Sequence, residues 1–267
     1  MLVTTLIIGI ALLGGLVTNR VIRARKSADD GESPSVTDLI SPLETFAVLM
    51  LAFVIVVAAE SYGEAEDGAS AEAEVVDHFF ETAEYLPEPF RRELQAGAVC
   101  YTRAVHEFEW KALADGQSAK EPSVWSSGFR DTFKQIPERD GVFEILVQAD
   151  TDRSVARSTR IAEADPSIPD IVFWFMALAL ALTIAAYAYS LPKRKAGFHI
   201  LAVVLLSALF ASSLALVKDI DTPFGGLVRI EPTQMEKTEN DITEDFTKAY
   251  GPDRLPCDDR GLPVAAR

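Results

Sequence analysis

Four apolar stretches stand in this chain as two close pairs, and a short basic linker joins the members of each pair. The stretches are residues 2–17, 46–59, 171–188 and 200–217. A membrane-spanning helix needs about 20 predominantly apolar residues, and about 17 is the usual lower limit. Both stretches of the second pair reach this length without a charged residue. The pattern predicts an all-helical membrane protein with four transmembrane helices in two pairs.

The two stretches of the first pair are shorter. Residues 46–59 lie between Glu44 and Glu60, and an uncharged run of that length is more often a buried helix than a membrane span. We still expect this stretch to cross the membrane, since a glutamate at headgroup depth is tolerable. In residues 2–17 the positive charge follows the apolar run, which favours an uncleaved anchor over a secretory signal peptide.

Lysine and arginine in short loops set the orientation of a membrane protein, because such loops stay in the cytoplasm. The basic residues of the two linkers are Arg20, Arg23, Arg25, Lys26, Lys193, Arg194 and Lys195. Both linkers fall on one side if all four stretches cross. We therefore expect a multi-pass protein of the bacterial plasma membrane, with its N- and C-termini outside the cytoplasm.

This topology divides the chain into eight segments. The expected spans are residues 1–18, 43–60, 168–190 and 198–217, and the cytoplasmic linkers are residues 19–42 and 191–197. Between the second and third spans we expect a helical extracytoplasmic domain, residues 61–167. An extracytoplasmic tail, residues 218–267, follows the last span. The polar, proline-punctuated sequence after Glu236 is typical of a partly disordered end.

The segment between the pairs is acidic and helical in pattern. Residues 60–169 hold 23 acidic and 11 basic residues, a balance that speaks against nucleic acid as a partner. Between Phe90 and Ala112 the apolar residues recur at intervals of three and four, which is the stripe of an amphipathic helix. We expect four helices here and assign their aromatic stripes to helix packing rather than to a ligand site.

Few residues in the chain form a pattern that points to chemistry. The three histidines, His78, His106 and His199, have no metal-ligand spacing, and the calcium-loop-like start at Asp150 has Val155 where such a loop needs glycine. Nucleophile and phosphate-binding motifs are also missing from the sequence. We expect neither an enzyme nor a metal or cofactor site. The apolar cores of the spans lack ionisable residues, which argues against a proton-coupled transporter but not against a channel.

Only two cysteines, Cys100 and Cys257, occur in the chain. The expected topology puts both on the oxidising side, where they could form a disulfide that ties the tail to the outer domain. A buried free thiol at Cys100, beside the stripe residue Tyr101, is the competing interpretation. The sequence leaves both open.

Small residues recur every four positions in the third apolar stretch, at Ala177, Ala181 and Ala185. Such a face allows helices to approach closely, within one chain or between chains. The spacing indicates a packed bundle in the lipid bilayer and is compatible with a homo-oligomer.

Several short segments resemble the bacterial bestrophin-like membrane proteins, a family of domains of unknown function. The segments are residues 59–62, 72–74, 86–87, 101, 109–110 and 221–230, within a resemblance that covers residues 1–236. The most specific element is the turn Pro223, Phe224, Gly225 and Gly226, which we expect just outside the membrane with Phe224 at its interface.

The resemblance implies four spans with a helical domain between the second and the third. It also implies kinship with bestrophins, which are pentameric anion channels gated by calcium. An acidic calcium clasp is not recognisable here, so no pore residue is carried over. The first hypothesis is an oligomeric protein resembling an anion channel. The alternative is a non-conducting envelope protein whose acidic outer domain binds a protein partner.

Overall fold

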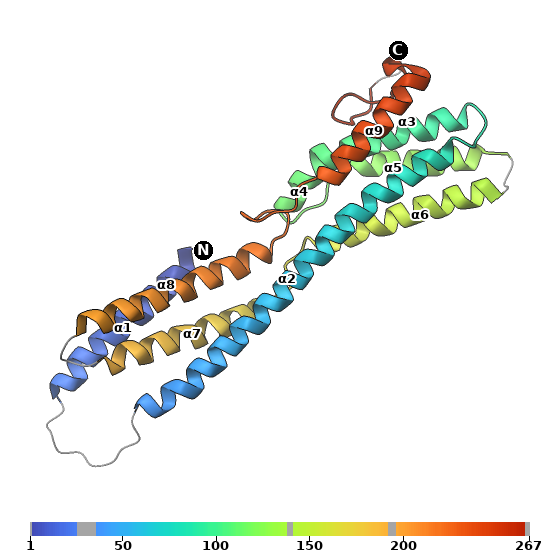
Figure 1. The fold of residues 1–267 in the computed structure, drawn as a ribbon. Coiled ribbons are helices and arrows are strands. Elements are labelled where there is room, and N and C mark those ends of the chain that lie inside the picture. The colour runs from blue at the N-terminus through green and yellow to red at the C-terminus, as the bar shows by residue number, and fades with distance from the viewer. Residues whose placement is uncertain (1, 26–35, 138–140, 192–195, 265–267) are drawn as a thin grey trace. The chain divides into compact units, whose positions relative to one another are not determined.

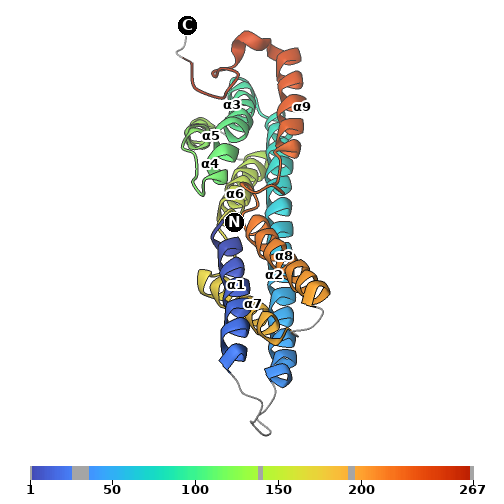
Figure 2. The same ribbon diagram turned by 90° about the vertical axis from the view of Figure 1, so that its left-hand side faces the viewer.

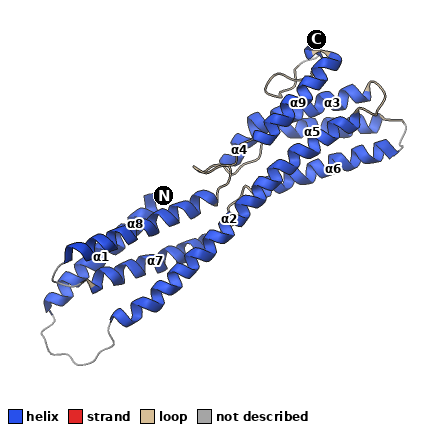
Figure 3. Cartoon of the chain, viewed as in Figure 1, coloured by secondary structure: helices blue, strands red, loops and turns tan. Residues whose placement is uncertain are grey.

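The chain folds into helices joined by short loops (Figures 1 and 3). The computed structural model describes residues 2–25, 36–137, 141–191 and 196–264, and within these the regular structure is helical. The helices are α1 (Leu2–Arg25), α2 (Val36–Ala83), α3 (Phe90–Ala104), the π-helix η1 (Val105–Glu109), α4 (Trp110–Ala114), α5 (Glu121–Gln135), α6 (Gly141–Ala162), α7 (Asp170–Ser190), α8 (Ala196–Ile220), α9 (Thr233–Tyr250) and the short 3₁₀-helix η2 (Pro252–Arg254).

These helices group into two compact units. The first, here called the apolar unit, consists of Met1–Glu60 and Pro166–Asp221, and the second, the polar unit, of Ser61–Asp165 and Thr222–Arg267. Helix α2 belongs to the apolar unit up to Glu60 and to the polar unit from Ser61. The tail expected as a separate segment therefore belongs, from Thr222 on, to the same unit as the domain between the second and third stretches.

Helices α1, α7 and α8 pack on one another within the apolar unit (Figure 2). The closest approach joins α1 to α7. A Cβ atom added to Gly15 would lie 2.6 Å from the carbonyl oxygen of Ala185 and 2.7 Å from the Cβ of Ala188, so only glycine fits there. The small residues of α7 thus serve helix contact within one chain, one of the two uses that their spacing allowed.

Within the described residues, three helices are long and apolar enough to cross a membrane, judged by length and composition. They are Ile40–Ala83, Asp170–Ser190 and Gly197–Ile220, and a shorter apolar helix covers Thr5–Val21. Residues 46–59 are therefore part of a much longer helix, and the short uncharged run does not limit its length. The first apolar stretch lies in α1, whose apolar part, Thr5–Val21, is shorter than the other three candidates.

Large apolar side chains also cover the outside of the apolar unit. Exposed positions include Leu13 on α1, Phe53 on α2, Phe175 on α7 and Leu205 on α8. Inside the unit, side chains such as that of Leu180 are fully buried. An apolar core combined with an apolar exterior is typical of a membrane-embedded bundle rather than of a water-soluble one.

Aromatic side chains form the core of the polar unit. Phe79 of α2, Tyr101 of α3, and Phe129 and Phe133 of α5 are buried, and the rings of Phe79 and Phe129 lie 4.8 Å apart between centroids. The expectation that the aromatic stripes pack helices together is confirmed.

The expectation of a partly disordered tail is wrong for the described residues 237–264. Helix α9 packs against α3, and Met235, Ile242 and Phe246 are buried. These three apolar residues lie on one face of a helix whose other residues are mostly polar, so the average composition hides the stripe. Residues 265–267 lie outside the described part of the chain.

The two cysteines form a disulfide in this structure. Cys100 lies on α3 and Cys257 follows η2, with their Cα atoms 5.8 Å apart. The turn after Cys257 also lies directly on α3, because a Cβ atom at Gly261 would come within 2.4 Å of the Ala104 nitrogen. The indole nitrogen of Trp125 on α5 donates a hydrogen bond to the Gly261 carbonyl at 2.8 Å. The end of the tail is thus held to both α3 and α5.

The disulfide should contribute strongly to stability. It closes a loop between residues 157 positions apart, and chain entropy gives about 5 kcal/mol for a loop of that size. We expect Cys257→Ser to lower the free energy of unfolding of the polar unit by up to that amount, measured by chemical denaturation with tryptophan fluorescence. Wild-type protein treated with a reductant should behave as the variant does. Two titratable thiols in untreated folded protein would contradict the pairing.

Candidate functional site

The polar unit buries a cluster of charged side chains, here called the ionic cluster. Its members are Glu72 of α2, Tyr101 of α3, Glu109 of η1, and Asp150, Arg153, Arg157 and Arg160 of α6. Three carboxylates face three guanidinium groups, so the cluster is neutral overall. Burial of charges in a protein interior is tolerated only when they are paired and hydrogen-bonded in this way.

Arg160 lies at the centre of the cluster and bridges two carboxylates from different helices. Its Nε donates to Glu72 Oε2 at 2.6 Å, and its Nη2 donates to Glu109 Oε2 at 2.5 Å. All three side chains are fully buried. The planar guanidinium presents donors in fixed directions, which suits a bridge between two fixed acceptors.

Arg157 holds the other side of Glu109. Its Nη2 lies 2.5 Å from Glu109 Oε1, and the same group donates to the Ala119 carbonyl at 3.1 Å, in the loop before α5. Its Nη1 donates to Ser123 Oγ at 3.0 Å. Glu109 is thus fixed by two arginines one helical turn apart on α6.

Tyr101 completes the arrangement around Glu72. Its hydroxyl donates to Glu72 Oε1 at 2.6 Å, so this carboxylate is bound at both oxygens. The Arg153 guanidinium stacks over the Tyr101 ring at 4.6 Å and pairs with Asp150 at 2.5 Å. Burial, together with the charge of Glu72, raises the pKa of the Tyr101 phenol well above its ordinary value. Tyr101 therefore stays protonated and remains a donor.

The arginines also keep their charge. Burial by itself lowers the pKa of Arg160, but the charges of Glu72 and Glu109 outweigh it, and the pKa rises above that of a free guanidinium. The Arg160 group also lies 4.8 Å from the centre of the Trp110 ring. Among the described residues, Arg160 Nη1 has no hydrogen-bond acceptor. The cation–π contact with the Trp110 ring stabilises the charge of the guanidinium in its place.

Trp110 links the cluster to the turn of residues 223–226. Its indole nitrogen donates to the Ile230 carbonyl at 3.0 Å, and its ring contacts Phe224 edge-on with centroids 5.7 Å apart. Phe224 is 3% exposed, so its ring packs inside the polar unit. The ring of Trp110 is its buried packing partner. A Cβ atom at Gly225 would lie 2.7 Å from the Ala114 carbonyl oxygen, which explains the glycine in the turn.

The π-helix η1 turns its two sides to different partners. Glu109, at its end, enters the ionic cluster, while His106 faces α9. The ring nitrogens of His106 lie 3.0 Å from carboxylate oxygens of Glu236 and Glu239. Irregular π turns often mark positions where a helix must present side chains in unusual directions. His106 therefore forms a bridge between η1 and α9.

The other residues singled out in the sequence lie apart from the ionic cluster or outside the described residues. Arg20, Arg23 and Arg25 belong to the last turns of α1. Lys26, Lys193, Arg194 and Lys195 lie outside the described part of the chain. Within the described residues no group of histidine, cysteine or acidic side chains is arranged to hold a metal ion.

The three arginines of the cluster escaped the sequence analysis. They lie at positions 153, 157 and 160, an interval of four and then three, which places them on one helix face. The signal was available, but a charged stripe on a helix is usually solvated. Their partners Glu72 and Glu109 were noticed only as parts of the resemblance, and Tyr101 as part of it and of the apolar stripe.

Comparison with known proteins identifies the family. The family model of the bestrophin-like domain matches residues 5–235. The chain belongs to the bestrophin-like family. No curated protein matches its sequence.

Solved structures share the fold of this bestrophin-like chain. A bacterial bestrophin homologue from Klebsiella pneumoniae superimposes with a TM-score of 0.70 at 12% identity, over 92% of this chain and 98% of that one. A second structure, a variant described as a membrane protein, gives a TM-score of 0.64 at 12% identity, over 94% and 96% of the two chains. At such low identity the similarity concerns the fold alone.

Breaking the ionic cluster should destabilise the polar unit strongly. Arg160→Met leaves Glu72 and Glu109 without their shared partner, and an unpaired buried charge costs about 3–5 kcal/mol. Arg160→Lys should recover only part of this, because an ammonium group cannot reproduce the fork. Lys134→Met, which removes an exposed 2.8 Å pair with Asp131, should change the free energy of unfolding by less than about 1 kcal/mol. Equal effects of Arg160→Met and Lys134→Met in denaturant unfolding would contradict the assignment.

Proposed function

We propose that this bestrophin-like chain is the protomer of an oligomeric anion channel in the bacterial plasma membrane. The observation that carries the proposal is the extent of the shared fold, which includes 98% of the Klebsiella pneumoniae homologue. The chain therefore contains the counterpart of nearly the whole solved protomer, rather than an isolated domain. Anion conduction is the activity that kinship with bestrophins implies.

The packing of the apolar unit supports an oligomer for this function. Met176, Leu180 and Ile184 of α7 and Leu214 of α8 are fully buried, so large apolar side chains fill the space between these helices. These side chains give the contact between α7 and α8 an apolar interior in the described part of the chain. A conducting path would then run between copies of the chain, lined by helix faces that are exposed in the single protomer.

Flux measurements test this function. Purified protein in sealed liposomes should release chloride faster than empty liposomes do, and the rate should increase with the amount of protein. Liposomes loaded with gluconate, a larger anion, serve as the selectivity control. Cross-linking in the same membranes should yield a closed oligomer. A monomer, or flux equal to that of empty liposomes, would contradict the proposal and favour the non-conducting envelope protein.

Orientation can be tested with single cysteines. We propose that the N- and C-termini and the polar unit lie outside the cytoplasm, and that the basic linkers lie inside. Both native cysteines are in the disulfide, so Ser118→Cys in the exposed loop after α4 would supply the sole reactive thiol. A membrane-impermeant maleimide should label it on intact cells and should fail to label Ser27→Cys in the first linker until the cells are opened. The reverse pattern would contradict this orientation.

A further inference from the structure

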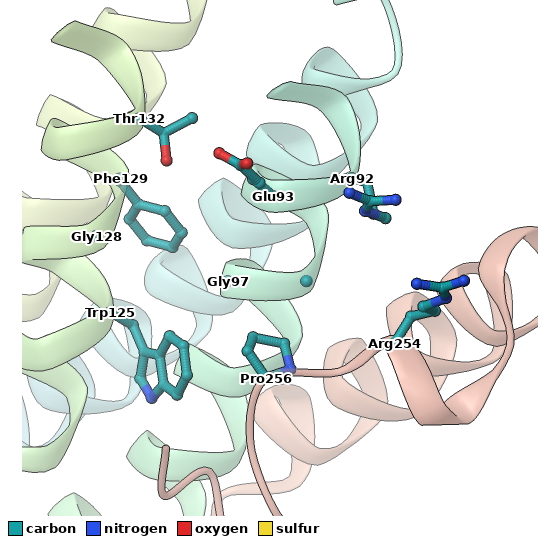
Figure 4. A pocket seen from close by; sticks show the side chains of 10 residues that line it. Arg92, Glu93, Gly97, Trp125, Gly128, Phe129, Thr132, Arg254 and Pro256 are labelled. Carbon is teal, nitrogen blue, oxygen red and sulfur yellow. The ribbon is translucent and has the colours of Figure 1, made fainter. Parts of the chain in front are cut away.

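The polar unit contains a pocket of about 230 Å³ between α3 and α5, bordered by the segment that precedes Cys257 (Figure 4). Arg92 and Glu93 come from the first turn of α3, Trp125 and Phe129 from α5, and Arg254 from η2. The pocket is separate from the ionic cluster and from the turn of residues 223–226. Neither the family nor the resemblance assigns it a role.

Two glycines shape this pocket in opposite ways. A Cβ atom at Gly97 would lie 2.7 Å from Phe129 Cε1, so this glycine allows α3 and α5 to pack closely. A Cβ atom at Gly128 would meet nothing within 4 Å, so this glycine leaves open space at the pocket. The missing side chain at Gly128 thus adds to the open space on the α5 side of the pocket.

The walls of the pocket are held in place. Phe129 is buried in the core, and the indole of Trp125 donates to the Gly261 carbonyl at 2.8 Å. Arg254 lies three residues before the disulfide of Cys257. A pre-formed wall reduces the ordering that binding would otherwise require.

Two guanidinium groups lie along one side of the pocket, those of Arg92 and Arg254 (Figure 4). Among the described residues, neither side chain is engaged in an ion pair or a hydrogen bond. The neighbouring Arg91, by contrast, binds Glu88 at 3.0 Å. The half-buried Arg92 and the exposed Arg254 thus have guanidinium donors available for a carboxylate, which arginine binds through paired hydrogen bonds.

The rest of the lining narrows the class of ligand. Glu93 adds a carboxylate and Thr132 a hydroxyl group to the lining (Figure 4). The Glu93 charge would repel a second anionic group on the ligand and attract an ammonium group. Trp125 and Phe129 supply an aromatic surface for an apolar group. The volume is below the roughly 300–1,000 Å³ typical of drug-sized ligands, which fits a molecule the size of one amino acid.

We propose that this pocket binds a free α-amino acid with an apolar side chain. The carboxylate contacts Arg92 and Arg254, the ammonium group contacts Glu93 and Thr132, and the side chain packs on Trp125 beside Gly128. The site lies in the polar unit and does not depend on whether the protein conducts anions.

Calorimetric titration of the full-length protein in detergent tests the site with L-phenylalanine as the probe. We expect saturable binding at one site per chain. Arg92→Gln and Arg254→Gln should each weaken it about tenfold or more, as expected for loss of a charged hydrogen bond. Arg91→Gln is the matched control and should leave the affinity unchanged. The analogues 3-phenylpropionate and 2-phenylethylamine each lack one charged group, and both should bind at least about tenfold more weakly.

Occlusion of the pocket gives a test that does not change its charge. Gly128→Leu places a side chain in the open space and should abolish binding. Gly63→Leu, a glycine of α2 with equal space around it, should not. The proposal would be overturned if wild-type protein that has kept its melting temperature through the titration gave no saturable heat. So would equal affinity for L-phenylalanine and 3-phenylpropionate, or unchanged binding in the folded Arg92→Gln variant.

Discussion

The bridge that Arg160 forms between Glu72 and Glu109 is the interaction on which the polar unit depends. Each of the three residues comes from a different helix, and all three are fully buried. Charges removed from water are costly, so their positions are acceptable only in the one arrangement that pairs them. Apolar packing of helices α2, η1 and α6 would tolerate several registers, whereas the bridge from Arg160 to two carboxylates fits one. We interpret the cluster as the element that selects the register of these helices.

The need to pair these buried charges also explains the contacts around the ionic cluster. Glu109 reaches Arg160 from the end of a π-helix, and Trp110, the next residue, covers the Arg160 guanidinium and holds Phe224. The turn after α8 is thus specified by an aromatic contact one residue from the cluster. Its glycine at position 225 then follows from the close carbonyl of Ala114. The most specific element of the family resemblance has a structural reason within the polar unit.

The sequence predicted the helical fold and the family better than it predicted the site. Apolar length and periodicity are local properties, so the membrane-spanning candidates and the aromatic stripes could be found from single segments. The ionic cluster joins residues up to 88 positions apart, and nothing local separates the buried arginines from solvated ones. The contact of Phe224 with Trp110 was missed for the same reason, since the two residues are distant in sequence. The tail was misjudged because three apolar residues on one face of α9 are outnumbered by polar neighbours.

Two independent features bear on the orientation that we propose. The basic linkers belong to the sequence around the apolar unit, and the rule that uses them takes no account of cysteine. The disulfide belongs to the polar unit and is stable only in an oxidising compartment, whatever the charges of the linkers. The first feature supports the proposed outside location of the polar unit through the expected membrane crossings, and the second supports it through redox chemistry. If the polar unit faced the cytoplasm, Cys100 and Cys257 would be expected to be reduced, against the disulfide. The basic linkers would then lie outside the cell, against the positive-inside rule. These would be two unrelated exceptions.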